Sequence, residues 1–138
     1  MIEYNCRMGD PETEVVLPRF RCDFVELMLA ANKGTLDRVH TEVNDRFTTT
    51  VFLVSGGYPG AYEKGKAITN LEQVHGSLIF HAGTKKDGHQ VVTNGGRVIA
   101  ITSFGFSMQQ ALDKSYKNAD VIQFQHKNYR RDIGFDLK

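Results

Sequence analysis

Residues 97–103, RVIAITS, decide the fold of this chain. From Val98 to Thr102 every residue is apolar or β-branched, so both faces of an extended segment here avoid water. A half-exposed strand would instead alternate apolar with polar residues. We therefore expect residues 97–103 to form the central, buried strand of a sheet.

Two segments upstream also have strand composition: SLIFHAGT, residues 77–84, and HQVVTN, residues 89–94. Their connections contain Asp-Gly in KKDG and Asn-Gly in NGG, and both dipeptides are strong hairpin signals. We expect a three-strand meander over residues 78–103. Still earlier, FTTTVFLVSGG, residues 47–57, is β-branched and aromatic and predicts another strand that ends at paired glycines.

Two helices are expected from apolar residues that recur at helical spacing. The first spans about residues 18–33 and is ended by Gly34. The second opens at Ser107, with Gln110 placed to complete a capping box. Their apolar faces comprise Phe20, Phe24, Leu27, Met28 and Ala31 in the first, and Met108, Ala111, Leu112, Tyr116 and Ala119 in the second. The tail is expected to pack through Tyr129, Ile133 and Phe135.

Length and composition bound the class of protein. A chain of 138 residues with net charge +1 and 41% hydrophobic residues fits one domain, or a small domain with part of another. This charge favours neither nucleic acid nor an anionic membrane as a partner, and no apolar run approaches the ~20 residues that span a bilayer. Because no secretory signal is visible, we expect a cytoplasmic protein in which Cys6 and Cys22 stay reduced.

The first residues carry the densest chemistry. IEYNCR, residues 2–7, alternates apolar and polar residues as a half-buried strand does. One face carries Ile2, Tyr4 and Cys6, and the other carries Glu3, Asn5 and Arg7. We expect Cys6 on the core face, where a thiol is inert. A turn at GDPE, residues 9–12, follows, because Pro11 disfavours helix at Asp10.

The polar face of this strand has two interpretations. A carboxylate and an amide oxygen are hard ligands suited to Mg²⁺, and an arginine beside them can hold a phosphate through two parallel hydrogen bonds. Glu3, Asn5 and Arg7 would then be half of a metal–phosphate site. The same alternation is common on an ordinary solvent-exposed face, so spacing alone leaves both interpretations open.

Three other features are candidates for a site. SGGYPGAYEKGK, residues 55–66, lacks the Gly-Lys-Ser/Thr ending of a P-loop and predicts a turn at the end of a strand. Without zinc-ligand spacing, three histidines are interpreted as ordinary core or surface residues: His75, His81 and His89. A charged cluster, which is either a solvated tail or a group near a substrate cleft, comprises Arg130, Arg131 and Asp132.

Five ordered segments resemble the phosphoribosylamine–glycine ligase family, whose members are also called glycinamide ribonucleotide synthetases. They are IEYNCRMGDPETEVVLPRF, SGGYPGAYEKG, FHAGT, VVTNGGRVIA and YRRDIG. The resemblance covers essentially the whole chain and is to the C-terminal part of the family's sequences. Met8 departs from the pattern, because many relatives carry phenylalanine there, but this exchange is apolar.

The resemblance implies an α+β fold. Residues 1–42 would be the terminal strand and helix of an ATP-grasp domain. Residues 43–138 would be a β-rich, antiparallel, hybrid-motif-like C-terminal domain with a flanking helix. Such a domain is related to the small β-rich cap of biotin-carboxylase-like ligases.

The resemblance also implies a site and a reaction. The residues that bind Mg²⁺ or Mn²⁺ ions bridging the ATP phosphates would be Glu3 and Asn5, and Arg7 would contact a phosphate or acyl phosphate. Further candidates for the substrate cleft are Asp10, Arg131 and Asp132. The implied reaction joins glycine to 5-phosphoribosylamine through glycyl phosphate, with ATP as co-substrate, in de novo purine biosynthesis.

The family's first, nucleotide-fold domain and the lysines of its ATP-grasp domain have no counterpart in this sequence. We therefore expect the isolated chain to lack ligase activity and to need those domains of the same polypeptide as partners. We also expect self-association through an edge strand at residues 2–7 and an apolar patch of Ile2, Tyr4, Phe20, Phe24 and Met28. The alternative function is a stand-alone, non-catalytic β-rich binding or scaffold module, whose own residues would cover this patch.

Overall fold

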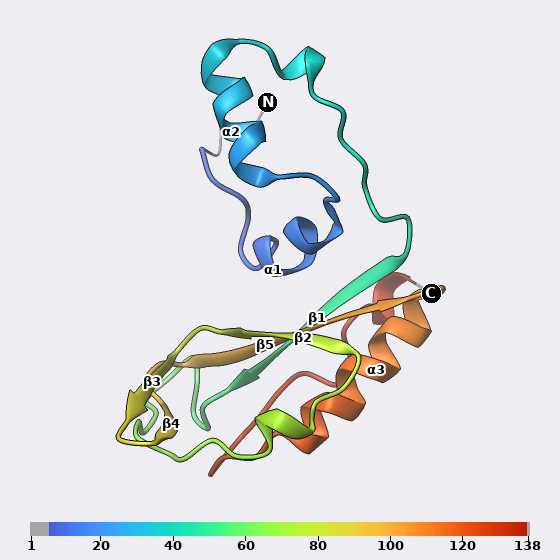
Figure 1. Ribbon diagram of the computed structural model, residues 1–138. Coiled ribbons are helices and arrows are strands. Elements are labelled where there is room, and N and C mark those ends of the chain that lie inside the picture. The colour runs from blue at the N-terminus through green and yellow to red at the C-terminus, as the bar shows by residue number, and fades with distance from the viewer. Residues whose placement is uncertain (1–5, 138) are drawn as a thin grey trace. The chain divides into compact units, whose positions relative to one another are not determined.

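The computed structural model describes residues 6–137, and the chain divides into two compact units, Met1–Arg46 and Phe47–Lys138 (Figure 1). The expected boundary between residues 42 and 43 lies in the segment just before the second unit begins. Each unit has its own elements and is described by itself. The assignment of the first unit to an ATP-grasp domain stays a prediction.

The first unit is built from short helical segments: α1 (Thr13–Val16), a 3₁₀ turn (Leu17–Arg19), α2 (Phe24–Lys33) and a second 3₁₀ turn (Leu36–Arg38). α2 begins later than the expected residue 18, because the Asp23 carboxylate caps a new start. It accepts hydrogen bonds from the N–H groups of Val25 and Glu26 at 2.8 and 3.2 Å. Gly34 ends the helix as predicted, in the left-handed conformation at φ 65°.

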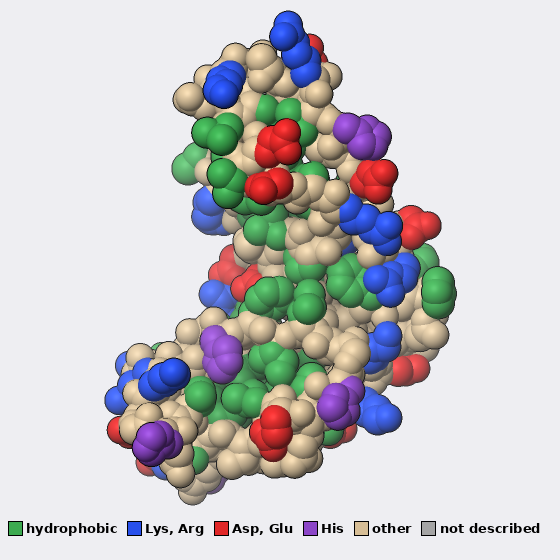
Figure 2. Space-filling model, in the orientation of Figure 1, with side chains coloured by type: hydrophobic (Ala, Val, Ile, Leu, Met, Phe, Trp, Pro, Cys, Tyr) green, Lys and Arg blue, Asp and Glu red, His purple; other side chains and the backbone are tan. Residues whose placement is uncertain are grey.

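α2 carries apolar residues on more than one side. Leu27 and Ala30 are buried, and the side chains that are between 48% and 65% exposed are Phe24, Val25, Met28 and Leu29. Figure 2 shows hydrophobic side chains at the surface over this helix. Two members of the expected apolar patch are therefore surface residues, Phe20 is partly buried, and Ile2 and Tyr4 lie outside the described residues. Self-association through this patch stays a prediction.

The second unit contains the predicted sheet. Three strands are antiparallel neighbours in the order β1 (Phe47–Val54), β5 (Arg97–Gly105) and β2 (Ser77–His81) (Figure 1). β5 is therefore the central strand, and its residues from Val98 to Ser103 all have 0% exposure. The predictions of a central, buried strand at residues 97–103 and of an α+β fold are confirmed.

The expected meander over residues 78–103 is wrong, because β2 pairs directly with β5. The intervening chain forms a separate antiparallel hairpin of β3 (Thr84–Asp87) and β4 (Gln90–Thr93). The turn of this hairpin lies at the Asp-Gly pair, as predicted, and Gly88 has φ 58° there.

A shift in register separates the hairpin from the sheet. Continuing the β2–β5 register would place Thr84 opposite Gly96, whereas Thr84 pairs with Thr93. The returning chain thus carries extra residues at 94–96, where NGG stands. These residues break what would be one long two-stranded ribbon into a sheet and a hairpin.

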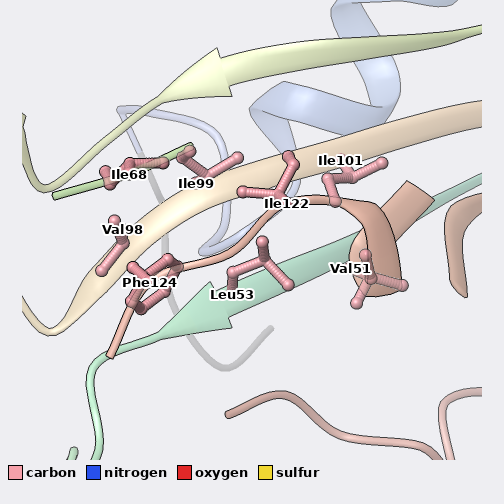
Figure 3. Packing of buried hydrophobic residues seen from close by; sticks show 9 residues of the cluster. Val51, Leu53, Ile68, Val98, Ile99, Ile101, Ile122 and Phe124 are labelled. Carbon is pink, nitrogen blue, oxygen red and sulfur yellow. The ribbon is translucent and has the colours of Figure 1, made fainter. Parts of the chain in front are cut away.

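The core of the second unit lies between the sheet and helix α3 (Met108–Val121), which packs along β5 and β1 (Figure 1). Figure 3 shows its buried apolar side chains. They are Val51, Leu53, Ile68, Val98, Ile99, Ile101, Ala119, Ile122 and Phe124. Because burying each of the larger side chains contributes roughly 1.5–3 kcal/mol, this cluster is the main apolar contribution to the unit's stability.

α3 begins at the predicted cap. The Ser107 hydroxyl accepts the N–H of Gln110 at 3.2 Å, and the Gln110 side chain accepts the N–H of Phe106 at 2.6 Å, one residue before the cap. The predicted apolar face is confirmed. Its members are buried at Ala111, Leu112 and Ala119 and partly buried at Met108 and Tyr116.

Polar side chains also fasten α3 to the sheet. The Ser115 hydroxyl donates to Ser103 on β5 at 2.8 Å and lies 3.1 Å from the Thr49 hydroxyl on β1. The Asn118 amide donates to the Ser77 hydroxyl on β2 at 2.7 Å. Each of these groups needs a partner to be buried without cost, so the network fixes where the helix can lie along the sheet.

The tail returns beside α3. Tyr129 and Ile133 pack against the core as predicted, and the N–H of Ile133 donates to the Tyr116 hydroxyl at 3.2 Å. The predicted packing of Phe135 is wrong, since its side chain is 64% exposed. Gly134, at φ 75°, turns the chain after Ile133 into a final 3₁₀ turn (Phe135–Leu137).

Replacing Ile101 with alanine should lower the free energy of unfolding of the second unit by about 2–5 kcal/mol, because a fully buried side chain in the central strand leaves a cavity. Leu78→Ala, on the neighbouring strand but 43% exposed, is the matched control and should cost less than about 1 kcal/mol. Urea unfolding followed by circular dichroism measures both. Equal losses would contradict the central position of β5 in the core.

Candidate functional site

The predicted metal ligands Glu3 and Asn5 lie outside the described residues. Arg7 is exposed, and its guanidinium donates to the carbonyl of Met8 at 2.9 Å. Cys6 is exposed, so the prediction that it faces a core is wrong. Residues 6 and 7 form a bend, and within residues 6–137 they have no neighbouring strand that would create a covered face. Both cysteines are free thiols.

The turn after Arg7 is well defined and borders a hollow. The N–H of Glu12 donates to the carbonyl of Gly9 at 2.8 Å, and the Glu12 carboxylate accepts the N–H of Gly9 at 2.8 Å. The hollow has a volume of about 350 Å³ and is lined by Arg7, Met8, Gly9, Asp10, Pro11, Thr13 and Glu14. Two predicted site residues, Arg7 and Asp10, therefore share one hollow in the first unit.

The other two predicted site residues belong to a charged cluster on the second unit, formed by the tail and the last turn of α3. The Arg131 guanidinium lies over the Tyr129 ring, with its carbon 4.6 Å from the ring centroid. Its Nη2 also donates to the Asp120 carboxylate at 3.2 Å, and the same carboxylate oxygen accepts the Tyr129 hydroxyl. Asp120 therefore holds both the ring and the guanidinium.

Arg130 and Asp132 form a separate pair beside this cluster. Two guanidinium nitrogens of Arg130 donate to the two carboxylate oxygens of Asp132, each at 2.9 Å. This bidentate bond lowers the pKa of Asp132 below its ordinary value. Arg131 and Asp132 are thus adjacent in sequence but engage different partners.

The Lys127 side chain caps the C-terminal end of α3. Its ammonium donates to the carbonyls of Ala119 at 2.7 Å and Ile122 at 2.5 Å, where a cation stabilises the negative end of the helix dipole. The ammonium also lies 5.8 Å from the Tyr129 ring centroid. Burial lowers the pKa of Lys127. Two cations therefore flank one tyrosine ring.

The ionisation of the cluster follows from these contacts. The hydrogen bond from Tyr129 lowers the pKa of Asp120, so Asp120 is a carboxylate at neutral pH. Burial and the bond to Asp120 raise the pKa of Tyr129 to about 12, so its hydroxyl keeps its proton. The arrangement presents a positive guanidinium on a neutral ring.

Sequence reasoning found Arg131 and Asp132 but missed Asp120 and Tyr129 as members of this cluster. One signal was available. A carboxylate in the last turn of a helix is electrostatically disfavoured, and Asp120 stands one residue before the end of α3. Such a residue is expected to have a specific cationic or donor partner.

The glycine-rich segments SGGYPG, FHAGT and NGG meet at one place in the second unit. The Ser55 N–H donates to the carbonyl of Gly96 at 2.8 Å, and the Ser55 hydroxyl donates to that of Gly95 at 2.8 Å. The Asn94 N–H donates to the carbonyl of Gly83 at 2.7 Å. SGGYPG forms the predicted turn at the end of β1.

Side chains would not fit at this glycine junction. A Cβ on Gly96 would lie 2.1 Å from the Tyr58 ring, and one on Gly83 would lie 2.7 Å from the Cα of Gly95. Gly57 has φ 96°, and a Cβ there would lie 2.1 Å from the carbonyl oxygen of Ala61. The glycines therefore serve close backbone packing, which gives the three segments a structural role.

The remaining candidates are surface features. The three histidines are exposed, and His81 bonds the Thr84 hydroxyl at 3.0 Å. Within residues 6–137 no three His, Cys, Asp or Glu side chains gather in a way that could hold a metal ion. Over the same residues, no helix combines the length and apolar character that crossing a bilayer requires.

The second unit is thus an antiparallel β-rich domain with one flanking helix, and residues 48–136 match the family model described as phosphoribosylglycinamide synthetase, C domain. The chain belongs to this family. The family resemblance predicted from the sequence is confirmed.

Individual relatives match over nearly the whole chain. Phosphoribosylamine–glycine ligases from Chlorobaculum tepidum and Vibrio cholerae are 45% and 46% identical over 137 residues, which are 97% and 98% of this chain. A bifunctional purine biosynthetic protein from Pichia angusta is 47% identical over 135 residues, which are 96% of this chain and 17% of its own. The chain spans 32% of the length of the two bacterial ligases.

A solved structure has the same fold. The crystal structure of phosphoribosylamine–glycine ligase from Thermotoga maritima matches with a TM-score of 0.82 and 39% identity. The match covers 96% of this chain and 32% of that one.

Gly96→Ala should lower the free energy of unfolding of the second unit by about 1–3 kcal/mol, because the added methyl group meets the Tyr58 ring. In a Tyr58→Ala background the ring is absent, so the same change should cost less, with a coupling on the order of 1 kcal/mol. Denaturant unfolding of the four proteins in this cycle measures the coupling. Independent, additive losses would show that the ring does not set the requirement for glycine.

Tyr129 should titrate near pH 12, and Asp120→Asn should move this pKa toward the ordinary value of about 10, because the charged acceptor is lost while burial remains. The raised pKa means that the contribution of Tyr129 to stability is present below about pH 10 and is lost as the pH rises through about 12. Carbon-13 NMR of labelled tyrosines resolves Tyr129 from the others. An unshifted Tyr129 would contradict the bond to Asp120.

Proposed function

We propose that this chain is the C-terminal part of an ATP-dependent ligase that joins glycine to 5-phosphoribosylamine. The observation that carries the proposal is continuous similarity, at 45–46% identity over 97–98% of the chain, to two phosphoribosylamine–glycine ligases. Because the chain spans about a third of those ligases, the whole reaction needs residues that it does not contain.

The proposed reaction has two steps. A glycine carboxylate oxygen attacks the γ-phosphorus of ATP, the bond to the β-phosphate oxygen breaks, and ADP leaves. The amine of 5-phosphoribosylamine then attacks the acyl carbon of glycyl phosphate, and inorganic phosphate leaves as the amide forms. A proton is lost from the attacking nitrogen, so the products are glycinamide ribonucleotide, ADP and phosphate.

Glu3 and Asn5 are the residues of this chain that would hold Mg²⁺ or Mn²⁺. A carboxylate and a neutral amide oxygen form a hard donor set that suits either ion and limits the negative charge near the phosphates. The ion, when bound, offsets the charge that develops on the transferred phosphoryl group. Arg7, two residues beyond Asn5, would contact the phosphate or acyl phosphate.

Asp10 and the Arg131–Asp132 pair are proposed as residues that face the substrates in the whole enzyme. Asp10 is supported by the hollow that it shares with Arg7. Arg131 is supported by its exposed side chain and its fixed orientation on Tyr129. The charge of Asp132 is neutralised by Arg130, so Asp132 would meet a substrate as part of the Arg130–Asp132 ion pair and not as an isolated charge.

The partner of this chain is proposed to be the ATP-binding remainder of the same ligase, in the cytoplasm. The apolar surface of α2 supports this proposal, because four large side chains there are about half exposed or more. A stand-alone binding or scaffold module, the alternative function, would cover such a surface with its own residues. Because the isolated chain lacks this ATP-binding remainder, we expect it to have no ligase activity.

A chimera tests the proposed function. In it, this chain replaces the matching residues of the Chlorobaculum tepidum ligase. The chimera should release ADP in a manner that depends on both glycine and 5-phosphoribosylamine, and Glu3→Gln should lower kcat by about 100-fold or more, because a metal ligand is lost. The isolated chain should release none.

Glu72→Gln is the matched control, since it removes the same charge from an exposed position in a 3₁₀ turn (Leu71–Gln73) of the second unit. It should leave kcat within about twofold of the parent chimera. If Glu3→Gln behaved like this control, the metal role of Glu3 would be wrong. A folded chimera that releases no ADP would contradict the proposed function itself.

A further inference from the structure

Two consecutive arginines on the second unit, Arg130 and Arg131, differ in how fully their charges are paired with carboxylates. Two guanidinium nitrogens of Arg130 donate to the two carboxylate oxygens of Asp132, so the charge of Arg130 is neutralised by a close bidentate partner. Arg131 makes one bond, from Nη2 to Asp120, and its other guanidinium edge is not engaged by that carboxylate. Its side chain is 68% exposed. Of the pair, Arg131 is the one that can receive a further anion.

Arg131 is held in place before any ligand arrives. The Tyr129 ring supports one face of the guanidinium at 4.6 Å, and Asp120 holds one of its nitrogens. Tyr129 is itself fixed by its hydroxyl bond to Asp120 and by the Tyr116 ring, whose centroid lies 6.2 Å away. An exposed arginine normally loses rotamer freedom when it binds, and these contacts reduce that loss.

The charge around Arg131 favours an anion. Lys127 lies over the same Tyr129 ring, and its ammonium is fixed on the end of α3. Arg131 and Lys127 together carry two positive charges against the single negative charge of Asp120, while Arg130 and Asp132 cancel each other. A planar guanidinium with donors left on one edge matches two oxygens of a phosphate.

We propose that Arg131 is a phosphate-binding group, with Asp120 and Tyr129 as its positioning residues, and that its ligand is a phosphate monoester. The edge of the guanidinium that points away from Asp120 would donate two parallel N–H bonds to two phosphate oxygens. Asp120 and Tyr129 do not touch the ligand. They hold the plane and the direction of the guanidinium.

Two sources supply a phosphate group that could bind here, a sugar phosphate, which is a monoester, and inorganic phosphate. The choice of the sugar phosphate rests on the proposed function, in which 5-phosphoribosylamine carries a phosphate monoester. The anion site rests only on the contacts of the second unit. Ribose 5-phosphate and inorganic phosphate are therefore separate arms of the test, and ribose is the uncharged control.

The first experiment is an NMR titration of the chain at pH 7.5, which follows the side-chain Nε–H signals of the arginines. Ribose 5-phosphate should shift the Arg131 signal in a saturable manner, and ribose should not. Arg131→Gln should weaken the affinity by about tenfold or more. Lys117→Gln, which removes an exposed positive charge from α3, should weaken it by less than about threefold.

The positioning residues are tested with Arg131 intact. Asp120→Asn should weaken ribose 5-phosphate binding about fivefold and broaden the orientations of Arg131, seen as a lower heteronuclear relaxation order parameter of its Nε–H. Tyr129→Leu should do the same by removing the ring. Asp113→Asn, on the same helix but bonded to Gln109, is the matched control and should change neither quantity.

Several outcomes would overturn the proposal. Equal losses in Lys117→Gln and Arg131→Gln would mean only diffuse electrostatic attraction. Unchanged binding in both Asp120→Asn and Tyr129→Leu would remove their positioning role. Tighter binding of inorganic phosphate than of ribose 5-phosphate would reject the sugar phosphate as ligand. Absence of saturable binding, together with an active chimera, would reject this site while the ligase function stood.

Discussion

The second unit depends on one strand that avoids water on every side. β5 forms hydrogen bonds with β1 on one edge and β2 on the other, and six of its residues in succession have no exposed surface. A strand in this position satisfies its backbone only if both neighbours are in register, because an unpaired buried N–H or carbonyl is costly. The position of α3 follows, since Ser103 on β5 receives the hydroxyl of Ser115. The tail then packs on α3 and brings Arg131 to Asp120.

Features that depend on neighbouring residues could be predicted from the sequence. The buried strand at 97–103, the Asp-Gly turn, the Ser107 cap and Gly34 at the helix end are of this kind. The meander could not, because the register between β2 and β5 is decided by residues far apart in the chain and by the three-residue shift at NGG. The start of α2 was misplaced because the cap at Asp23 outweighs the apolar pattern that begins at Phe20.

The candidate site residues also fall into two groups, those that a local sequence motif suggests and those that only the fold brings together. Resemblance to a family makes Glu3, Asn5 and Arg7 candidates from a contiguous motif, and Arg131 and Asp132 from another, and their roles stay proposals. The contacts of Asp120 and Tyr129 with Arg131 could be found only from the fold, because these residues meet across the last turn of α3. Adjacent charges also look alike in a sequence, whereas the structure separates Arg130, which is neutralised, from Arg131, which is only partly so.

The split between sheet and hairpin has a consequence for the motions of the second unit. Amides of β5 are bonded inside a covered sheet, so they would exchange with solvent deuterium only when the whole unit opens. β3 has a hydrogen-bonded partner in β4 alone among the described strands, and most of its residues are exposed, so β3 can fray from β4. β4 is held more firmly, because residues 65–68 bond to its other edge and Val92 and Thr93 are buried. The glycine junction lies between the slowly exchanging strand β5 and the hairpin that contains β3. It would act as the border of a cooperative unfolding unit, with slow exchange in β5 and faster exchange in β3.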